Sequence, residues 1–209
     1  MKVLTMPVGP VETNCYITFS ENCKCGILID PGAEPVKILA EIAQRGIRIF
    51  AIFATHGHFD HIGAVDRLRG ALEVPAYASQ LEAEIAGNVE LNRSGVMGRE
   101  PITCQFDKFL LHERMLDMGF ARIKPLLTPG HTQGHTALYL PDHDILFSGD
   151  CLFKEGYGRY DLPTSDFEKL KKSLISLFEL PEHTRVFPGH GPPTTIRHEK
   201  LHNPILKEL

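Results

Sequence analysis

The chain has 209 residues, 43% of them hydrophobic, and its 22 Lys and Arg residues against 26 Asp and Glu residues give a formal net charge of -4. This length suits one sizeable core and is short for two independent domains, so we expect a single domain over residues 1–209. The slight acidity offers no cationic surface for nucleic acid or for an anionic membrane, and small molecules are the expected partners.

The amino-terminal region contains Pro7, Gly9 and Pro10, which interrupt it before a signal-peptide core could form. No uninterrupted apolar stretch approaches the length that spans a membrane. We therefore expect a cytoplasmic protein. The five cysteines are scattered and odd in number and contain no C-x-x-C pair, so the sequence predicts neither a disulfide framework nor a zinc knuckle.

The first part of the chain reads as three strands followed by a helix and a buried strand. The strands are expected at Lys2–Val8, Asn14–Ser20 and Gly26–Asp30. Pro35 suits the first turn of the helix, and Gly46 stands where a left-handed cap is needed. The β-branched and aromatic run Ile47–Thr55 is typical of a fully buried strand.

The middle of the chain gives weaker signals. We expect a strand at Pro75–Ala78 and a helix over Ser79–Ala86. The segment Gly87–Thr103 mixes Asn, Gly, Arg and Pro without a clear period, so the sequence assigns it no structure. Because long loops in compact domains are usually functional or mobile, we expect a flap beside the functional site.

Strand signals return in the second half of the chain, at Ala121–Leu127, Ala137–Leu140, Ile145–Ser148 and Arg185–Phe187. Between the last two, Ser165–Glu168 forms a capping box that begins a helix with an apolar stripe of Phe167, Leu170, Leu174, Leu177 and Phe178. Strands and helices in both halves predict an α/β fold in which two sheets pack face to face with helices outside them.

At the carboxyl end of the expected buried strand lies Thr55-His56-Gly57-His58-Phe59-Asp60-His61, which places three imidazoles and one carboxylate within seven positions. Such crowding is costly unless a divalent cation binds the side chains together. The carboxyl ends of strands are also where α/β sheets place their sites. The alternative, a polar loop with scattered histidines, leaves the close spacing unexplained, so we interpret the cluster as a metal site.

Three later turns repeat one design, in which an apolar strand ends in a glycine followed by His131, Asp150 or His190. Each glycine would let the backbone approach a common centre without a side chain in the way. With the first cluster these residues provide five imidazoles and two carboxylates. If one carboxylate bridges, that set is sufficient for two divalent ions that each keep a position for water, as catalytic sites do.

This pattern resembles the metallo-β-lactamase superfamily, whose hallmark is T-H-x-H-x-D-H followed by later His, Asp and His ligands; the resemblance runs from about Val11 to His190 and is closest to the glyoxalase II-like hydroxyacylglutathione hydrolases. It implies the four-layer αβ/βα sandwich. It also implies that one metal is held by His56, His58 and His131 and the other by Asp60, His61 and His190, with Asp150 bridging them. Asp30 and His135 are expected to support these ligands, although His135 could equally be an ordinary buried histidine.

The metal pair would polarise a carbonyl and lower the pKa of a bound water to about 7, so that an ester-like bond is hydrolysed without a Ser or Cys nucleophile. The resemblance makes Asp60 the expected catalytic residue, which orients the nucleophile and passes its proton to the leaving group. Zinc is the expected metal, and iron or manganese would suit the same ligands.

The loop after Asp150 resembles the glyoxalase II loop that contacts glutathione, which implies that Arg159 and Tyr160 bind substrate. Only a short tail follows Gly191-Pro192-Pro193, where larger glyoxalase II enzymes carry a helical domain with more glutathione contacts. We therefore predict a hydrolase for hydroxyacyl-glutathione or a related small thioester. The alternative is a persulfide dioxygenase with a single iron on His56, His131 and Asp150, which has no need for the second ligand set.

Overall fold

Two six-stranded sheets form the centre of the computed structural model, which describes residues 1–97 and 100–208. The first sheet has, in spatial order, β1 (Lys2–Val8), β2 (Thr13–Phe19), β3 (Cys25–Ile29), β4 (Arg48–Phe53), β5 (Ala76–Ala78) and β6 (Lys108–Phe109). The second has β14 (Thr194–Thr195), β13 (Arg185–Pro188), β10 (Ile145–Gly149), β9 (Thr136–Leu140), β8 (Arg122–Leu127) and β7 (Leu116–Asp117). A separate small hairpin joins β11 (Leu152–Phe153) and β12 (Gly156–Tyr157).

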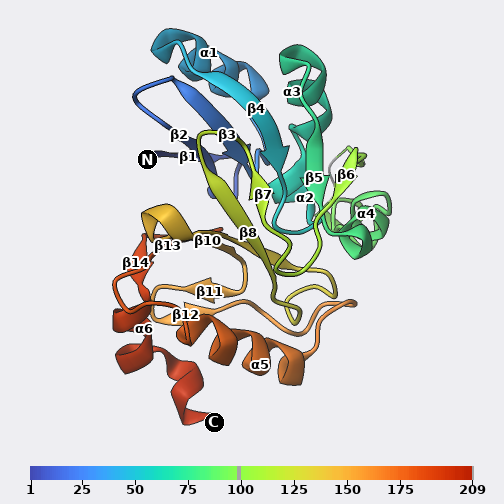
Figure 1. Cartoon of the computed structure of the whole chain (residues 1–209). Helices are drawn as coiled ribbons and strands as arrows, with labels where there is room; N and C mark the ends of the chain where they lie inside the picture. Colours follow the sequence, from blue (N-terminus) through green and yellow to red (C-terminus); the bar gives the residue numbers. More distant parts are fainter. Residues whose placement is uncertain (98–99, 209) are drawn as a thin grey trace.

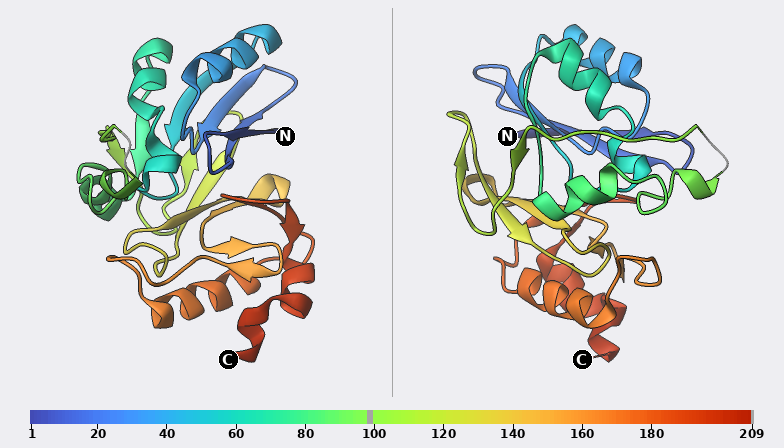
Figure 2. Two further views of the ribbon diagram at one scale, coloured as in Figure 1. Left: turned by 180° about the vertical axis from the view of Figure 1, so that it is seen from behind. Right: turned by 90° about the vertical axis from the view of Figure 1, so that its right-hand side faces the viewer.

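Helices cover the outer face of each sheet (Figure 1). The helices α1 (Pro35–Arg45) and α3 (Val65–Leu72) lie on the first sheet, and α5 (Phe167–Phe178) and α6 (Ile196–His202) lie on the second. Both views in Figure 2 show the same sequence of layers, helices, sheet, sheet and helices. The short helices α2 (Phe59–Ile62) and α4 (Gln80–Ala86) and the 3-10 turns η1 (Gly95–Met97), η2 (Pro141–His143) and η3 (Pro204–Lys207) complete the described elements.

Three apolar cores separate the four layers, because alternate side chains of a strand point to opposite faces of its sheet. On β2, Ile17 packs outward with the α1 and α3 residues, whereas Tyr16 faces the second sheet. The central core joins Phe53 of the first sheet to Phe147 of the second. A third core lies under α5, where Leu174 is fully buried. The four-layer αβ/βα sandwich expected from the sequence is confirmed.

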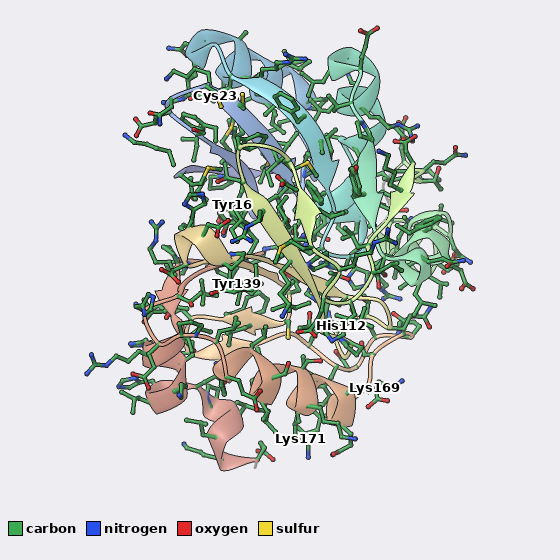
Figure 3. The ribbon with its side chains drawn as sticks, viewed as in Figure 1. Tyr16, Cys23, His112, Tyr139, Lys169 and Lys171 are labelled. Atoms are coloured by element: carbon green, nitrogen blue, oxygen red, sulfur yellow. The ribbon has the colours of Figure 1, made fainter. Side chains whose placement is uncertain are left out.

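Tyr16 joins the two sheets directly, at the position labelled in Figure 3. Its hydroxyl donates a 2.6 Å hydrogen bond to the carbonyl of Pro188, at the end of β13. Its ring centre lies 5.1 Å from that of Phe147 and 5.7 Å from that of Phe187. The Asn14 backbone amide also donates to the Gly189 carbonyl at 2.7 Å. The turn that carries His190 is therefore fastened to the first sheet.

The structure corrects one expected helix start. The capping box predicted Ser165 as the cap of α5, but the cap is Asp166, whose side chain accepts a hydrogen bond from the Lys169 amide. The Ser165 hydroxyl instead donates to the His131 carbonyl at 2.8 Å, so it does not cap the helix. At α1 the expectations hold, since the helix begins at Pro35 and Gly46 has a left-handed φ of 63°.

Other elements were not expected from the sequence, namely α2, α3 and the short strands β6, β7, β11, β12 and β14. The unassigned segment Gly87–Thr103 contains described turns in which Asn92 and Ser94 are buried, while residues 98–99 lie outside the described residues. Among the described helices, none is long and apolar enough to cross a bilayer. The five cysteines are free thiols.

Candidate metal centre

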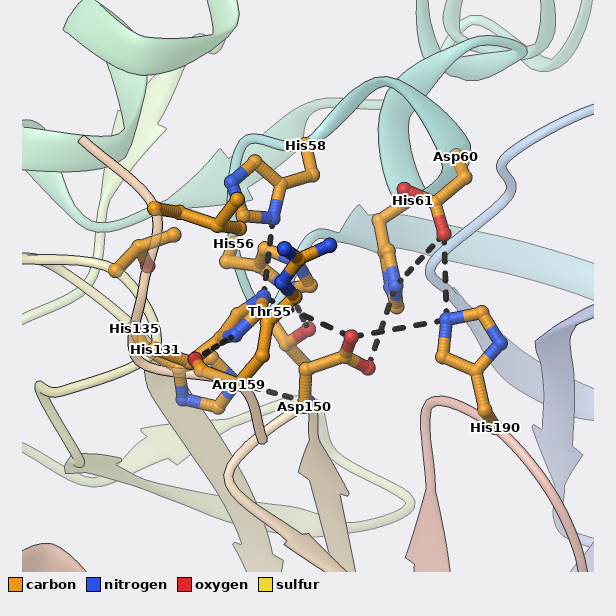
Figure 4. A network of polar contacts seen from close by, with 12 residues as sticks. Thr55, His56, His58, Asp60, His61, His131, His135, Asp150, Arg159 and His190 are labelled. Atoms are coloured by element: carbon orange, nitrogen blue, oxygen red, sulfur yellow. Dashed lines mark hydrogen bonds and ion pairs between the residues drawn. The ribbon is translucent and has the colours of Figure 1, made fainter. Parts of the chain in front are cut away.

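The His- and Asp-rich cluster follows β4 and runs into α2. His58 has an extended backbone, with φ -69° and ψ 149°, and is the last residue before α2 begins. The backbone therefore changes from extended to helical between His58 and Asp60. Figure 4 shows the result, with His56 and His58 on one side of the cluster and Asp60 and His61 on the other.

The second sheet contributes the remaining side chains from the ends of its strands. His131 follows β8, Asp150 follows β10 and His190 follows β13. Since β10 and β13 are parallel neighbours, their carboxyl ends lie at one edge of the sheet, facing the end of β4. All seven residues expected as ligands therefore come together, although they span 135 positions from His56 to His190.

Their donor atoms form three groups in which all atoms lie within 4.8 Å of one another: His56, His58 and His131; His56, His61 and Asp150; and Asp60, His61 and His190. The first and third groups coincide with the two ligand sets expected from the sequence. Asp150 lies between them, with one carboxylate oxygen 3.4 Å from His61 Nε2 and the other 3.6 Å from both His131 Nε2 and His190 Nε2. This position suits a bridging carboxylate.

Several buried atoms of the cluster have no hydrogen-bond partner among the described residues: His56 Nε2, His58 Nε2, His61 Nε2 and Asp150 Oδ1. Leaving such an atom buried and unsatisfied costs about 1–3 kcal/mol. A divalent cation would bind these atoms, and imidazole nitrogens with carboxylate oxygens are ligands that suit zinc, iron or manganese. The residues fit a metal centre, and the assignment of each ligand stays a prediction.

The two ligand sets differ in how readily their imidazoles bind a proton. Burial lowers the pKa of His56 and His58 well below the usual range, and neighbouring imidazoles lower it further. Burial also acts to lower the pKa of His61, but Asp60, Asp150 and Asp30 outweigh it and raise this pKa to about 10. Without metal, the first set is therefore neutral and the second carries a proton. A cation binding to the second set would displace that proton.

Asp30 contacts the cluster directly. Its carboxylate accepts hydrogen bonds from the Thr55 amide at 2.7 Å and from the Thr55 hydroxyl at 2.8 Å. The same carboxylate lies 3.0 Å from His61 Nδ1. It thus orients the ring of His61 and fixes the residue that precedes His56, as a supporting residue would.

His135 supports a different part of the site than its sequence position suggests. Its Nε2 accepts a 3.1 Å hydrogen bond from the Asp150 backbone amide, and its Nδ1 lies 2.8 Å from the Thr128 hydroxyl. Burial keeps the pKa of His135 well below the usual range. The neutral ring accepts at Nε2 and donates at Nδ1, so it holds the backbone of Asp150.

Two residues that contact the cluster were missed by sequence reasoning. The Thr13 hydroxyl donates a 2.8 Å hydrogen bond to Asp60 Oδ2. Glu82 is fully buried on α4 and contacts the loops beside His56 and His131, through Gly57 and Thr132. Nothing local distinguishes either residue in the sequence, because a threonine in a strand and a glutamate in a helix are common.

The expectation that each glycine lets a ligand turn approach the centre holds for two of the three turns. A Cβ on Gly189 would lie 2.1 Å from Asp150 Oδ1, and one on Gly149 would lie 2.5 Å from the Thr55 hydroxyl. It is wrong for Gly130, where a Cβ would lie 2.3 Å from Leu170 Cα. Gly130 instead allows the His131 turn to pack against α5.

A cavity of about 290 Å³ opens over the cluster and is lined by Val11, His58, Phe59, Asp60, Arg93, Val96, His131, Asp150, Arg159, Leu162 and His190. Arg159 lies in front of the cluster (Figure 4), but its guanidinium forms a two-bonded ion pair with Asp161 at 2.7 and 2.8 Å. Tyr160 lies outside this lining, with its ring centre 4.3 Å from that of Phe167. Substrate contact by these two residues stays a prediction.

The sequence-family model of the metallo-β-lactamase superfamily matches residues 8–190 of this chain. The chain belongs to this superfamily. It is 39% identical to the probable metallo-hydrolase YqgX of Bacillus subtilis, over 99% of this chain and 98% of that relative. It is 30% identical to the hydroxyacylglutathione hydrolase GloC of Haemophilus influenzae, again over 99% of this chain and 98% of the relative.

Solved structures of the superfamily have the same fold. The B3 metallo-β-lactamase BLEG-1 superposes with a TM-score of 0.94 and 36% identity, over 98% of this chain and 99% of that one. The di-iron-bound form of TTHA1623 superposes with a TM-score of 0.88 and 39% identity, over 97% of this chain and 100% of that one. The chain is therefore a metallo-hydrolase superfamily member in which five His and two Asp residues form one metal-compatible cluster.

Proposed function

We propose that this protein is a dinuclear metal-dependent hydrolase that cleaves the thioester of hydroxyacyl-glutathione or a related small thioester. The observation that carries the proposal is the complete second donor set, Asp60, His61 and His190, beside the first set and next to Asp150. A dioxygenase with one iron would need only His56, His131 and Asp150 and would leave this second set without a task.

The two ligand sets would hold the ions, zinc being expected and iron or manganese also suitable. When bound, such a pair polarises a carbonyl and makes water a stronger acid. Asp60 faces the cavity, where Thr13 and His190 hold its Oδ2 at 2.8 and 3.2 Å. We assign Asp60 the proton of the attacking water, which it then passes to the leaving sulfur.

The comparisons support both parts of this proposal. GloC is a hydroxyacylglutathione hydrolase that aligns along nearly the whole chain, and the di-iron form of TTHA1623 is consistent with two ions on this fold. The cavity adds apolar walls at Val11, Val96 and Leu162, which suit the carbon chain of a small thioester. Arg159 at its rim would bind a substrate carboxylate only after leaving Asp161.

The test is the hydrolysis of lactoylglutathione by protein loaded with zinc, iron or manganese, together with the metal content per chain. We expect two ions per chain and turnover with at least one metal. Activity on another ester, without turnover of lactoylglutathione by any metal form, would exclude the proposed substrate. One iron per chain with oxygen uptake on glutathione persulfide would establish the dioxygenase instead.

The likeness to BLEG-1 favours a second candidate, hydrolysis of the strained amide of a β-lactam at the same centre. A β-lactam and a thioester both present a carbonyl carbon to the attacking water, so the ligand sets alone do not discriminate between them. Parallel assays with a chromogenic cephalosporin and with lactoylglutathione compare the two candidate activities. A higher kcat/KM for the cephalosporin would make the β-lactam the better substrate.

A further inference from the structure

Arg93 lies on the wall of the cavity over the metal centre and is half-buried there. Within the part of the chain that the structure describes, no carboxylate lies within ion-pair distance of its guanidinium. Arg159, the other arginine of the cavity, is paired with Asp161 by two hydrogen bonds. Arg93 is therefore the cation that the described cavity leaves available to a ligand.

The backbone holds Arg93 in a fixed place. Its φ of 70° lies in the left-handed region, which few non-glycine residues adopt. The preceding residue, Asn92, is buried, and its side chain donates to the Ile102 carbonyl at 2.7 Å. The Asn92 carbonyl accepts a 2.9 Å hydrogen bond from the Phe59 amide, in the middle of the ligand cluster. These contacts fix the backbone of Arg93 at the cavity wall.

The surroundings of Arg93 define what it can bind. It lines the cavity together with His58 and Arg159, and its charge acts on both His58 and Asp161, so it lies near the first ligand set and near the rim. The neighbouring side chains of Val96 and Leu162 are apolar, so neither can form a hydrogen bond with an anionic ligand beside Arg93. A guanidinium fits a carboxylate with two parallel hydrogen bonds, and partial exclusion of water strengthens them.

We infer that Arg93 binds a carboxylate on the thiol half of the substrate, so that the protein selects thioesters whose leaving thiol is anionic. The inference rests on the proposed function and narrows it, because in hydroxyacyl-glutathione every carboxylate belongs to the thiol half and none to the hydroxyacyl group. Arg93 would thus hold the substrate by its leaving group while the carbonyl lies over the metal ligands. It is a binding residue, and it takes no part in proton transfer.

The test compares wild-type protein with Arg93→Gln, Arg93→Lys and a matched control, Arg67→Gln. Arg67 is exposed on α3 and does not line the cavity. S-methylglutathione, a thioether that cannot be hydrolysed, measures binding to the zinc-loaded protein by calorimetry. Lactoylglutathione and the uncharged S-lactoyl-N-acetylcysteamine then measure selectivity as a ratio of kcat/KM values. Circular dichroism checks the fold, and glutamine keeps the backbone cost of the left-handed position unchanged.

We expect Arg93→Gln to weaken S-methylglutathione binding, and to lower the ratio of kcat/KM for the charged over the uncharged thioester, by about 10–100-fold each. The loss in the ratio should come from a higher KM for lactoylglutathione. Arg93→Lys should restore part of both, because it returns the charge without the planar fork. Arg67→Gln should behave as wild type.

The outcomes separate the two ideas. Equal binding of S-methylglutathione by wild type and Arg93→Gln, or the absence of binding by wild type, overturns the role of Arg93. If binding depends on Arg93 but wild type hydrolyses neither thioester, the carboxylate site stands and the proposed reaction fails. If wild type hydrolyses both thioesters with a ratio that Arg93→Gln leaves unchanged, the reaction stands and the inference fails.

Discussion

Glu82 Oε2 accepts a 2.6 Å hydrogen bond from the backbone amide of Gly57, the residue between His56 and His58. Its other oxygen accepts from the Thr132 hydroxyl at 2.7 Å and from the Gly134 amide at 2.8 Å, in the loop that follows His131. One buried carboxylate thus joins the loop that carries His56 and His58, after the first sheet, to the loop that carries His131, after a strand of the second sheet.

Replacing this carboxylate by an amide should disturb the ligand loops. In Glu82→Gln, an NH2 group would face the Gly57 N–H, so a buried donor loses its acceptor and stability falls by about 1–3 kcal/mol. Urea unfolding at about pH 5 measures the loss, and the visible spectrum of cobalt-loaded protein should shift as the ligands move. The exposed Glu84 on the same helix provides the control Glu84→Gln, which should match wild type. An unchanged cobalt spectrum would contradict this role.

The stabilising effect of Glu82 should depend on pH. Burial raises its pKa to about 7, from an ordinary value of 4.5, against three hydrogen bonds that lower it. Between these values the folded chain binds more protons than the unfolded chain, so the added stability is complete below the lower pKa and is lost as the pH rises through the higher one.

The free energy of unfolding of metal-free wild type, minus that of Glu82→Gln, should therefore fall between about pH 5 and about pH 8. The slope is at most about 1.4 kcal/mol per pH unit for one proton. Urea titrations at four pH values measure it, and the subtraction removes groups common to both proteins. A difference that grows with pH would refute the assignment.

Asp60→Asn should lower turnover by orders of magnitude with little change in folding. The amide keeps the shape of the side chain but cannot take the proton of the attacking water. Thr13→Val, which removes one hydrogen bond to Asp60, should cause a smaller fall in kcat. Initial rates and thermal unfolding of both variants test this, and near-normal turnover by the asparagine variant would reject Asp60 as the catalytic residue.

Asp161→Asn should improve the binding of anionic ligands. The hydrogen bond from Arg159 lowers the pKa of Asp161 to about 2, so Asp161 is a carboxylate. This carboxylate neutralises the Arg159 guanidinium at the cavity rim. Its removal frees a second cation, so the Kd of S-methylglutathione should fall, most strongly at low salt. Both side chains are exposed, so stability should change little. Calorimetry at two salt concentrations measures the Kd of S-methylglutathione for wild type and for Asp161→Asn. An unchanged Kd would mean that Arg159 does not contact the ligand.

Removal of metal by a chelator should lower the thermal midpoint, and adding zinc should restore it in proportion to the logarithm of the free zinc concentration. The reason is the set of buried donors that have no partner among the described residues, such as His56 Nε2 and Asp150 Oδ1. Calorimetric scans at several zinc concentrations provide the measurement. A midpoint insensitive to both chelator and zinc would mean that the cluster binds no metal in the folded protein.

Sequence reasoning located the cluster at His56–His61 because its side chains are adjacent in the chain and their chemistry is visible without a structure. It could not find Arg93, whose position depends on a hydrogen bond between Asn92 and Phe59 across an aperiodic segment. Glu82 was hidden for a similar reason, since only the packing of α4 shows that the carboxylate is buried. These misses share a cause: contacts between distant segments decide them.

Local sequence patterns also failed to predict the correct helix start where two neighbouring residues could each cap the helix, and they failed to predict a short helix. Ser165 and Asp166 are both good helix caps, and the choice between them follows from the carbonyl of His131, which takes the serine hydroxyl. Helix α3 buries only Val65 and Leu68 and contains Gly70, so its apolar stripe is short and its propensity weak. Tertiary packing stabilises it.

The ligands on the first sheet and those on the second come within reach only when the sheets have docked, a contact that Tyr16 makes with Pro188. Each of the two proposed ligand sets takes donors from both halves of the chain, so complete coordination of the proposed metal ions would follow the closing of the sandwich, late in folding. Bound ions would then cross-link the two halves, much as a disulfide would. The rate of ion release would then limit the rate at which the sheets separate, and a chain short of metal should unfold faster and be cleaved sooner by proteases.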